Sequence, residues 1–218
     1  ADVDRAVSGA MISKYRNAGQ TCVCTNRILV QHEIYDDFLS KFKSACEKLV
    51  IGDGQKEATT IGPLIDSNAA EDVKNLIEDA KIKGARIEFG GDTCDLGDNF
   101  INPTILSNIN TSMRVFNEEI FGPVAPIIKF ETENEAIELA NQTDFGLAAY
   151  FYSRDIGRVY RVSEKLEFGI IGVNEGIISN EMAPFGGIKE SGNGREGSKY
   201  GLDDYLEIKY VCVGGINE

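Results

Sequence analysis

The sequence has a single histidine, His32, and no surplus of positive charge, since 22 Lys and Arg stand against 35 Asp and Glu. The net charge of −13 argues against a nucleic-acid partner, because a phosphate backbone is bound by clustered Lys and Arg. Long apolar runs are also missing. The longest are short segments such as VAPII, so no segment is expected to span a membrane. The N-terminus lacks the basic start and apolar core that mark a signal peptide.

Five cysteines, at positions 22, 24, 46, 94 and 212, form an odd number spread over a chain of 218 residues. This usage suits a reducing compartment better than a secreted disulfide framework, so we expect a cytoplasmic protein. Cys46 and Cys212 lie in apolar patterns and are predicted to be buried free thiols, whereas Cys94 is expected in a loop. The length and the 42% hydrophobic content are those of one well-cored globular domain.

The first residues already follow a helical pattern, with apolar side chains at helical spacing over residues 1–17. A natural protein rarely opens inside an element without a methionine. We therefore expect this sequence to be a piece of a longer chain.

Helical and strand-like segments alternate along the rest of the sequence. Helices are predicted over 34–50, 67–84, 133–143 and 154–166, and strands over 27–31, 85–91, 101–106, 123–130, 147–153 and 168–174. For the helix over 67–84, Ser67 or Asn68 is the expected N-cap and Gly84 the expected stop. Continuous apolar strands separated by helices predict an α/β fold with a doubly wound, mostly parallel sheet covered on both faces. The segment 206–215 is strand-like, and would either close the edge of the domain or pair with another subunit.

The stretch RNAGQTCVCTN places Cys22 and Cys24 one residue apart. A zinc site is disfavoured because the pair lacks a second pair of ligands and only His32 could supply an imidazole. A disulfide across such a short loop is strained and labile. Two alternatives remain: two small buried side chains, or a nucleophilic thiol approached through Gly-Gln-Thr, whose own amide can donate to an oxyanion.

Two further segments suggest chemistry. NEEIFGPV (117–124) joins two carboxylates to an aromatic ring and a turn, and is either a ligand-holding segment or a solvated surface turn. APFGGIKESGNGREGSKYG (183–201) is rich in glycine but lacks the Gly-Lys-Ser/Thr of a Walker loop and does not follow a strand as a dinucleotide fingerprint does. Its glycines predict close approach between chain segments.

Taken together, YRNAGQTC, EEIFGPV and PFGGIKESGNGRE resemble, in order and spacing, the catalytic domain of the aldehyde dehydrogenase superfamily. Within it, RNAGQTCVCTNR, NEGIISNE and GREGSKYGLDDYLEIKYVC are most similar to bacterial-type succinate-semialdehyde dehydrogenases, which use NAD or NADP. The resemblance implies a catalytic domain over residues 1–206 and an oligomerisation strand over 207–218. It also implies that the Rossmann-type cofactor domain lies outside these residues.

The resemblance assigns roles residue by residue. Cys22 matches the catalytic nucleophile. Glu119 matches the residue that holds the nicotinamide-ribose hydroxyls, and Phe121 matches the ring beside the nicotinamide. Arg16 and Ser179 match residues that bind the far carboxylate of succinate semialdehyde. Phe185 matches a wall of the aldehyde pocket.

The chemistry of these residue types fits those roles. A guanidinium suits a bidentate grip on a small carboxylate, and Arg16 precedes Cys22 on the same approach. The expected reaction passes through a cysteine thiohemiacetal and a thioester. The general-base Glu and the oxyanion-hole Asn of the family lie upstream of this sequence, so we predict that the chain alone has no dehydrogenase turnover. No metal is expected.

Cys24 is a candidate for redox regulation, because related succinate-semialdehyde enzymes carry this second cysteine and in some the pair forms a disulfide that silences the nucleophile. The alternative is a small residue beside the nucleophile. Two other readings of the whole chain stay open: an aldehyde dehydrogenase with another substrate, and a non-catalytic binding or assembly module. The expected partners are a small aldehyde and further copies of the protein.

Overall fold

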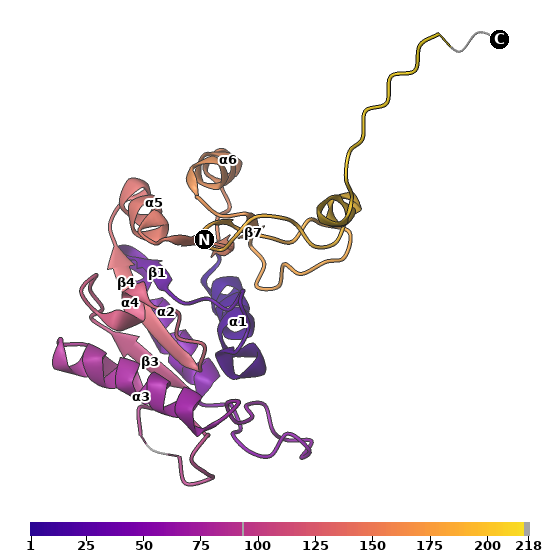
Figure 1. The fold of residues 1–218 in the computed structure, drawn as a ribbon. Helices are drawn as coiled ribbons and strands as arrows, with labels where there is room; N and C mark the ends of the chain where they lie inside the picture. Colours follow the sequence, from indigo (N-terminus) through magenta and orange to yellow (C-terminus); the bar gives the residue numbers. More distant parts are fainter. Residues whose placement is uncertain (93, 216–218) are drawn as a thin grey trace.

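The computed structural model describes residues 1–92 and 94–215, in which helices and strands alternate (Figure 1). The α-helices are α1 (Val3–Tyr15), α2 (Tyr35–Cys46), α3 (Ser67–Ile82), α4 (Arg114–Asn117), α5 (Glu133–Asn141) and α6 (Ile156–Lys165). The strands are β1 (Ile28–Gln31), β2 (Arg86–Phe89), β3 (Thr104–Ser107), β4 (Val124–Phe130), β5 (Phe145–Gly146), β6 (Ala148–Phe151), β7 (Ile170–Val173) and β8 (Ile188–Lys189). Short 3-10 helices cover Arg16–Gly19, His32–Ile34 and Lys199–Tyr205.

The main sheet has the strand order β1-β4-β3-β2. β1 and β3 each run parallel to β4, whereas β2 at the edge runs antiparallel to β3. All of β3 and residues 124–128 of β4 are buried, so helices must cover both faces of these central strands. The predicted α/β class with a mostly parallel sheet is confirmed.

Two smaller sheets continue the fold toward the C-terminus. β6 runs parallel to β7, and β5 pairs antiparallel with β8, a pairing that the sequence pattern does not predict. β8 lies in the glycine-rich segment 183–201, whose predicted close approach is observed. A Cβ on Gly169 would lie 2.1 Å from the carbonyl oxygen of Gly186, so a larger side chain there would collide with backbone.

The core forms where α1, α2 and α3 bury their apolar faces against the main sheet. Phe42 of α2 is fully buried, and its ring stacks on Tyr15 at 5.9 Å and on Phe38 at 5.5 Å between centroids. Cys46 is buried beside them, as predicted. Burial of this aromatic group fixes the C-terminal end of α1, from which the cysteine loop begins.

The helix boundaries are set by side chains that accept backbone hydrogen bonds. Asp66, and not Ser67 or Asn68, is the N-cap of α3, and its carboxylate accepts from the amide of Ala69 at 2.8 Å. The prediction was one or two residues late because Ser, Asn and Asp are all good caps and three of them stand in a row. At the other end, Gly84 has a φ of +96°, which favours glycine and marks the predicted stop.

Residues 206–215 form no strand and extend away from the body of the chain (Figure 1). They therefore do not close the edge of a sheet within the described residues, and the predicted boundary at 206 falls where the last 3-10 helix ends. The prediction that Cys212 is buried is wrong: its side chain is exposed in this extension, because no element of the chain covers it. Residues 216–218 of the predicted strand lie outside the described residues.

Among residues 1–92 and 94–215, no helix combines the length and apolar character that a membrane crossing needs.

Candidate active site

The chain leaves α1 through an unusual backbone turn before it reaches Cys22. Asn17 and Ala18 have φ values of 52° and 56°, and Gly19 has a φ of 80°. Three consecutive residues in the left-handed region are rare when two of them carry a Cβ, and such strain persists only where surrounding contacts fix it. The turn redirects the chain into a partly buried loop over residues 20–26, in which Cys22 is the exposed residue.

A contact between two glycines joins this loop to the segment after α4. A Cβ on Gly19 would lie 2.2 Å from the carbonyl oxygen of Gly122, so only glycine permits the approach. Gly122 in turn lies against Val73 of α3. The two motifs around Cys22 and Glu119, far apart in the sequence, are therefore packed together.

Side chains hold the loop at several points. Gln20 donates from Nε2 to the carbonyl of Pro63 at 3.3 Å and accepts at Oε1 from the amide of Ile65 at 2.9 Å. Thr25 donates from its amide to the Ser13 carbonyl at 3.1 Å and from its hydroxyl to the Ser13 hydroxyl at 2.8 Å. The loop is thus tied to helix α1 and to the segment before α3.

Arg27, at the far end of the loop, binds the C-terminal end of α5. Its guanidinium donates to the carbonyl oxygens of Leu139, Ala140 and Gln142 at 2.9, 2.9 and 3.1 Å. Burial lowers the pKa of Arg27 to about 10. The guanidinium satisfies the carbonyl groups that every helix leaves unpaired at its C-terminus.

The two cysteines of the loop are in different surroundings. Cys22 is exposed, whereas Cys24 is partly buried and its sulfur lies 2.6 Å from the Thr21 hydroxyl and 3.8 Å from the carbonyl oxygen of Arg16. Both are free thiols in this structure. Within the described part of the chain, no group of three or more His, Cys, Asp and Glu is arranged to hold a metal ion.

A cavity of about 620 Å³ opens beside the loop, and Cys22, Cys24, Glu119 and Tyr150 are among the residues that line it. Tyr150, in β6, donates from its hydroxyl to the carbonyl oxygen of Val23 at 2.8 Å, between the two cysteines. Burial raises the pKa of Tyr150 well above its ordinary value, so the phenol stays a donor. Sequence reasoning missed Tyr150, which resembles any other apolar strand residue in the pattern LAAYFYS.

Lys14 lies buried in the last turn of α1, with a side chain only 1% exposed. No hydrogen bond or ion pair to its ammonium is found within the described residues. Burial lowers the pKa of Lys14 to about 8, and the neighbouring Cys24 and Glu119 oppose that shift. The signal that could have found it is its position, since Lys14 follows Val7 and Met11 along the apolar face of the helix.

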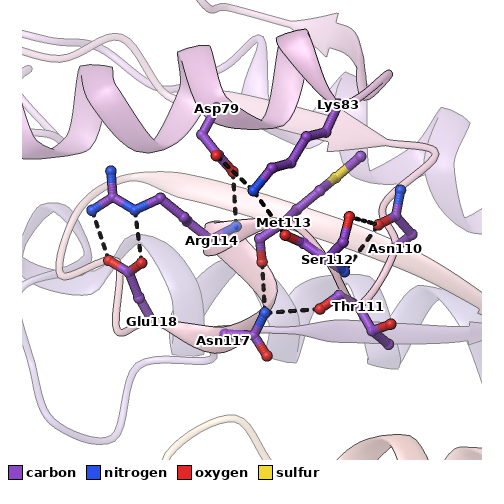
Figure 2. A network of polar contacts seen from close by, with 9 residues as sticks. All are labelled: Asp79, Lys83, Asn110, Thr111, Ser112, Met113, Arg114, Asn117 and Glu118. Atoms are coloured by element: carbon purple, nitrogen blue, oxygen red, sulfur yellow. Dashed lines mark hydrogen bonds and ion pairs between the residues drawn. The ribbon is translucent and has the colours of Figure 1, made fainter.

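The two adjacent glutamates, Glu118 and Glu119, differ in their contacts. Glu118 accepts two hydrogen bonds at 2.7 Å from Arg114, which lower its pKa (Figure 2). Glu119 accepts none from the described residues. Partial desolvation in the cavity raises the pKa of Glu119, while Lys14 opposes the shift. Its carboxylate is thus available to a ligand.

Arg16 begins the turn before Cys22, and its Nε is buried without a hydrogen-bond partner among the described residues. Buried donors are almost always paired, so an orphaned one in the turn that leads to the cysteine loop suggests an absent acceptor. The contacts of the Cys24 sulfur with the Arg16 carbonyl oxygen and of the Tyr150 hydroxyl with the Val23 carbonyl oxygen bring these segments together.

The predicted substrate- and cofactor-binding residues Arg16, Phe121, Ser179 and Phe185 are not among the residues that line the cavity in the described chain. Phe121 has a φ of 48° and a side chain 45% exposed, next to the Gly19–Gly122 contact. Ser179 is exposed in the segment after β7, which crosses α1 where Gly176 meets Gly9. Phe185 is half-buried, and its backbone exchanges hydrogen bonds of 2.9 and 2.7 Å with Glu196.

The exposed thiol of Cys22 and the carboxylate of Glu119, which accepts no hydrogen bond from the described residues, line one cavity, and comparison with known proteins identifies the family. The model of the aldehyde dehydrogenase family matches residues 1–211. The chain belongs to the aldehyde dehydrogenase family.

Individual relatives are similar to this chain over nearly all of its length. The chain is 58% identical over 217 residues to a 3-sulfolactaldehyde dehydrogenase of Pseudomonas putida, covering 100% of this chain and 45% of that protein. It is 58% identical over 214 residues to the NADP(+) succinate-semialdehyde dehydrogenase of Escherichia coli (strain K12), and the match covers 98% of this chain and 44% of that protein. A succinate-semialdehyde dehydrogenase structure from Burkholderia pseudomallei, 55% identical, aligns with a TM-score of 0.96 over 98% of this chain and 44% of that one. The chain therefore spans about half the length of the relatives it matches.

Proposed function

We propose that this chain supplies the catalytic half of an NAD(P)-dependent succinate-semialdehyde dehydrogenase, with Cys22 as the nucleophile. The observation that carries the proposal is that the exposed thiol of Cys22 lines the same cavity as the carboxylate of Glu119. A thiol alone in a loop would be compatible with a binding module. A thiol that shares a cavity with a carboxylate suited to ribose hydroxyls favours an enzyme of this family.

The residues present fit a nicotinamide cofactor. Glu119 has no competing hydrogen-bond donor among the described residues, so its oxygens can accept from the two hydroxyls of a ribose. Phe121 offers an exposed ring two residues further on. When bound, NAD or NADP would supply the hydride acceptor.

The steps assigned to this chain centre on Cys22. Its thiolate forms a bond to the aldehyde carbon, and the carbonyl oxygen becomes an oxyanion that the amide of Cys22 can stabilise. Once hydride has left, the carbon is held as a thioester. Water then breaks the carbon–sulfur bond, which releases the carboxylate and regenerates the thiol.

Substrate choice rests on Arg16, whose buried Nε has no partner among the described residues. A substrate with a terminal anion would supply the missing acceptor, and Ser179 would add a hydroxyl donor. A bidentate guanidinium–carboxylate pair is among the strongest hydrogen-bonded contacts in proteins. Succinate semialdehyde is short, so its anion must be anchored close to the thiol, and Arg16 precedes Cys22 by six residues in the turn that leads to it.

The test uses an assembled enzyme, in which this chain replaces the matching segment of the Escherichia coli relative. Arg16→Ala should lower kcat/KM for succinate semialdehyde by about 100-fold, and for uncharged butanal by no more than about 5-fold. Arg86→Ala, at an exposed arginine, serves as the control. Equal losses for both aldehydes would favour another substrate.

The sulfonate of 3-sulfolactaldehyde is a second candidate anion, because the Pseudomonas putida relative is equally similar over the whole chain. A sulfonate carries an extra oxygen and more bulk than a carboxylate. The ratio of kcat/KM for the two substrates in the assembled enzyme decides between them.

The purified chain alone should give no steady NAD(P)H with succinate semialdehyde. The general base and the cofactor domain that the resemblance implies are expected outside these residues. Steady NAD(P)H from the chain alone would contradict this.

The same proposal includes homo-oligomerisation through residues 207–218. It also includes a cytoplasmic location, which the five free cysteines suggest.

Reversible Cys22–Cys24 oxidation is the proposed regulation. Peroxide removes two electrons from the pair and is itself reduced to water, leaving the nucleophile within a strained and reducible bond. In the assembled enzyme, Cys24→Ala should abolish the inactivation by peroxide that a dithiol reductant reverses. Unchanged reversible inactivation in that variant would refute the switch.

A further inference from the structure

The side-chain amide of Asn26 bridges the two backbone groups on either side of Glu119. Its Nδ2 donates to the carbonyl oxygen of Glu118 at 2.8 Å, and its Oδ1 accepts from the amide of Ile120 at 2.9 Å. Both peptide units that flank Glu119 are therefore fixed by one side chain. We propose that Asn26 is a positioning residue that couples the nucleophile loop to Glu119, so that the thiol and the ribose-binding carboxylate are held as one unit.

Asparagine is the residue type that this arrangement requires. Its amide carries a donor and an acceptor side by side, which matches the carbonyl and the N–H presented by the backbone. Aspartate would lose the donor, and alanine would lose both contacts. Asn26 lies in the same short loop as Cys22, only a few residues further along the chain. Its two hydrogen bonds therefore connect the loop that carries the thiol to the segment that carries Glu119.

The segment that contains Glu118 is also fixed on the side of α3 and α4 (Figure 2). The carboxylate of Glu118 is paired with the guanidinium of Arg114, whose amide donates to Asp79 of α3 at 2.9 Å. Lys83, the C-cap residue of α3, adds an ion pair with Asp79 and a hydrogen bond to the Ser112 carbonyl. Glu118 is thus held by its side chain to Arg114 of α4, which is itself bound to α3, and by its carbonyl to Asn26, while the carboxylate of Glu119 makes no hydrogen bond with the described residues.

The chain provides a matched control in Asn141. Its Nδ2 donates to the carbonyl of Lys165 at 2.8 Å, and its Oδ1 accepts from the amide of Glu167 at 2.9 Å. It therefore makes the same bridge with nearly equal distances, but between α5 and the segment after α6. Replacing either asparagine by alanine removes the same number and kind of hydrogen bonds.

The experiment measures the Kd for NADP⁺ by calorimetry, the cofactor KM and kcat, and the Tm of the assembled enzyme. Asn26→Ala should raise Kd and cofactor KM by about 10-fold, and Asn26→Asp by less. Asn141→Ala should lower Tm about as much and leave Kd within about 2-fold. In a Glu119→Ala background, Asn26→Ala should cause no further loss of cofactor affinity, because the group that it positions is gone.

Additive losses in the double variant, or an Asn26→Ala Kd within about 2-fold of the unmutated enzyme, would overturn the positioning role. The inference rests on the proposed function, and the two can fail separately. An unmutated assembled enzyme that binds NADP⁺ but oxidises no aldehyde contradicts the proposed function, while the Kd comparison still judges Asn26. If Asn26→Ala does not fold, Asn26→Asp and its double variant with Glu119→Ala give the same comparison.

Discussion

Lys14 is the residue whose position in the fold conflicts most with its chemistry. A cation buried without a hydrogen-bond partner among the described residues destabilises the folded state unless it loses its proton. Burial lowers its pKa to about 8 from an ordinary value of 10.5. Its neighbours Cys24 and Glu119 both line the cavity. The free-energy cost of burying this charge therefore arises next to the proposed active site.

The stability of the protein should therefore depend on pH through Lys14. Between pH 8 and 10.5 the unfolded chain binds more protons at this lysine than the folded chain does, so stability rises as pH increases through this window. The penalty below pH 8 is about 3 kcal/mol. Lys14→Met should stabilise the chain by roughly that amount at pH 7 and remove the rise, as urea unfolding at pH 7 and above pH 9 would measure.

Lys48→Met, at an exposed lysine, is the control and should leave the pH dependence as it is. A Lys14→Met variant that is less stable at pH 7, or that keeps the full rise with pH, would show that the ammonium has a stabilising partner.

At the same scale, the local and distinctive motifs around Cys22 and Glu119 were enough to select both residues from the sequence, and both line the same cavity. Their catalytic roles stay predictions. Asn26 and Tyr150 make contacts with residues far away in the sequence, and no local pattern distinguishes them from ordinary loop or strand residues. Lys14 could have been found from its place on the apolar face of α1. Cys212 was predicted to be buried because alternation reports an apolar face without showing what covers it.

At the scale of elements, most helices and strands begin and end within a few residues of the predicted positions, since apolar periodicity fixes their type. Boundaries depend on single capping side chains. At α3 three adjacent residues could cap, and Asp66 does so. The short antiparallel pair β5–β8 was not predicted, because two-residue strands bury too little apolar surface to leave a pattern.

The α3 cap gives a direct test. Asp66→Ala should destabilise the chain by about 1 kcal/mol, because the amide of Ala69 loses its acceptor. Ser67→Ala, one residue later, should change the free energy of unfolding by less than about 0.5 kcal/mol. Urea unfolding of both variants measures this difference, and a larger effect at Ser67 would restore the cap predicted from the sequence.

At the scale of the whole molecule, the fold of the described chain gives no reason for the exposed apolar side chains of the extension 206–215. It exposes Leu206, Ile208 and Tyr210 at alternate positions, with Ile208 99% exposed. Alternation of this kind is typical of a strand that pairs at a sheet edge. We expect the edge to belong to a second copy of the protein.

Ile208→Asp should therefore lower the oligomer mass of the assembled enzyme, as measured by sedimentation, because a charge would have to be buried in the new sheet. Ile65→Asp, at an isoleucine that is 82% exposed elsewhere, should leave the mass unchanged. An unchanged mass for Ile208→Asp would remove the extension from the interface.

The central claim is that Cys22, and not Cys24, is the nucleophile of an aldehyde-oxidising enzyme. NADPH formation by the assembled enzyme with succinate semialdehyde tests it most directly, in the unmutated form and in the Cys22→Ala and Cys24→Ala variants. We predict steady turnover in the unmutated enzyme, none in Cys22→Ala, and turnover within about 10-fold of the unmutated rate in Cys24→Ala. Turnover that survives in Cys22→Ala, or that is lost only in Cys24→Ala, would contradict the claim.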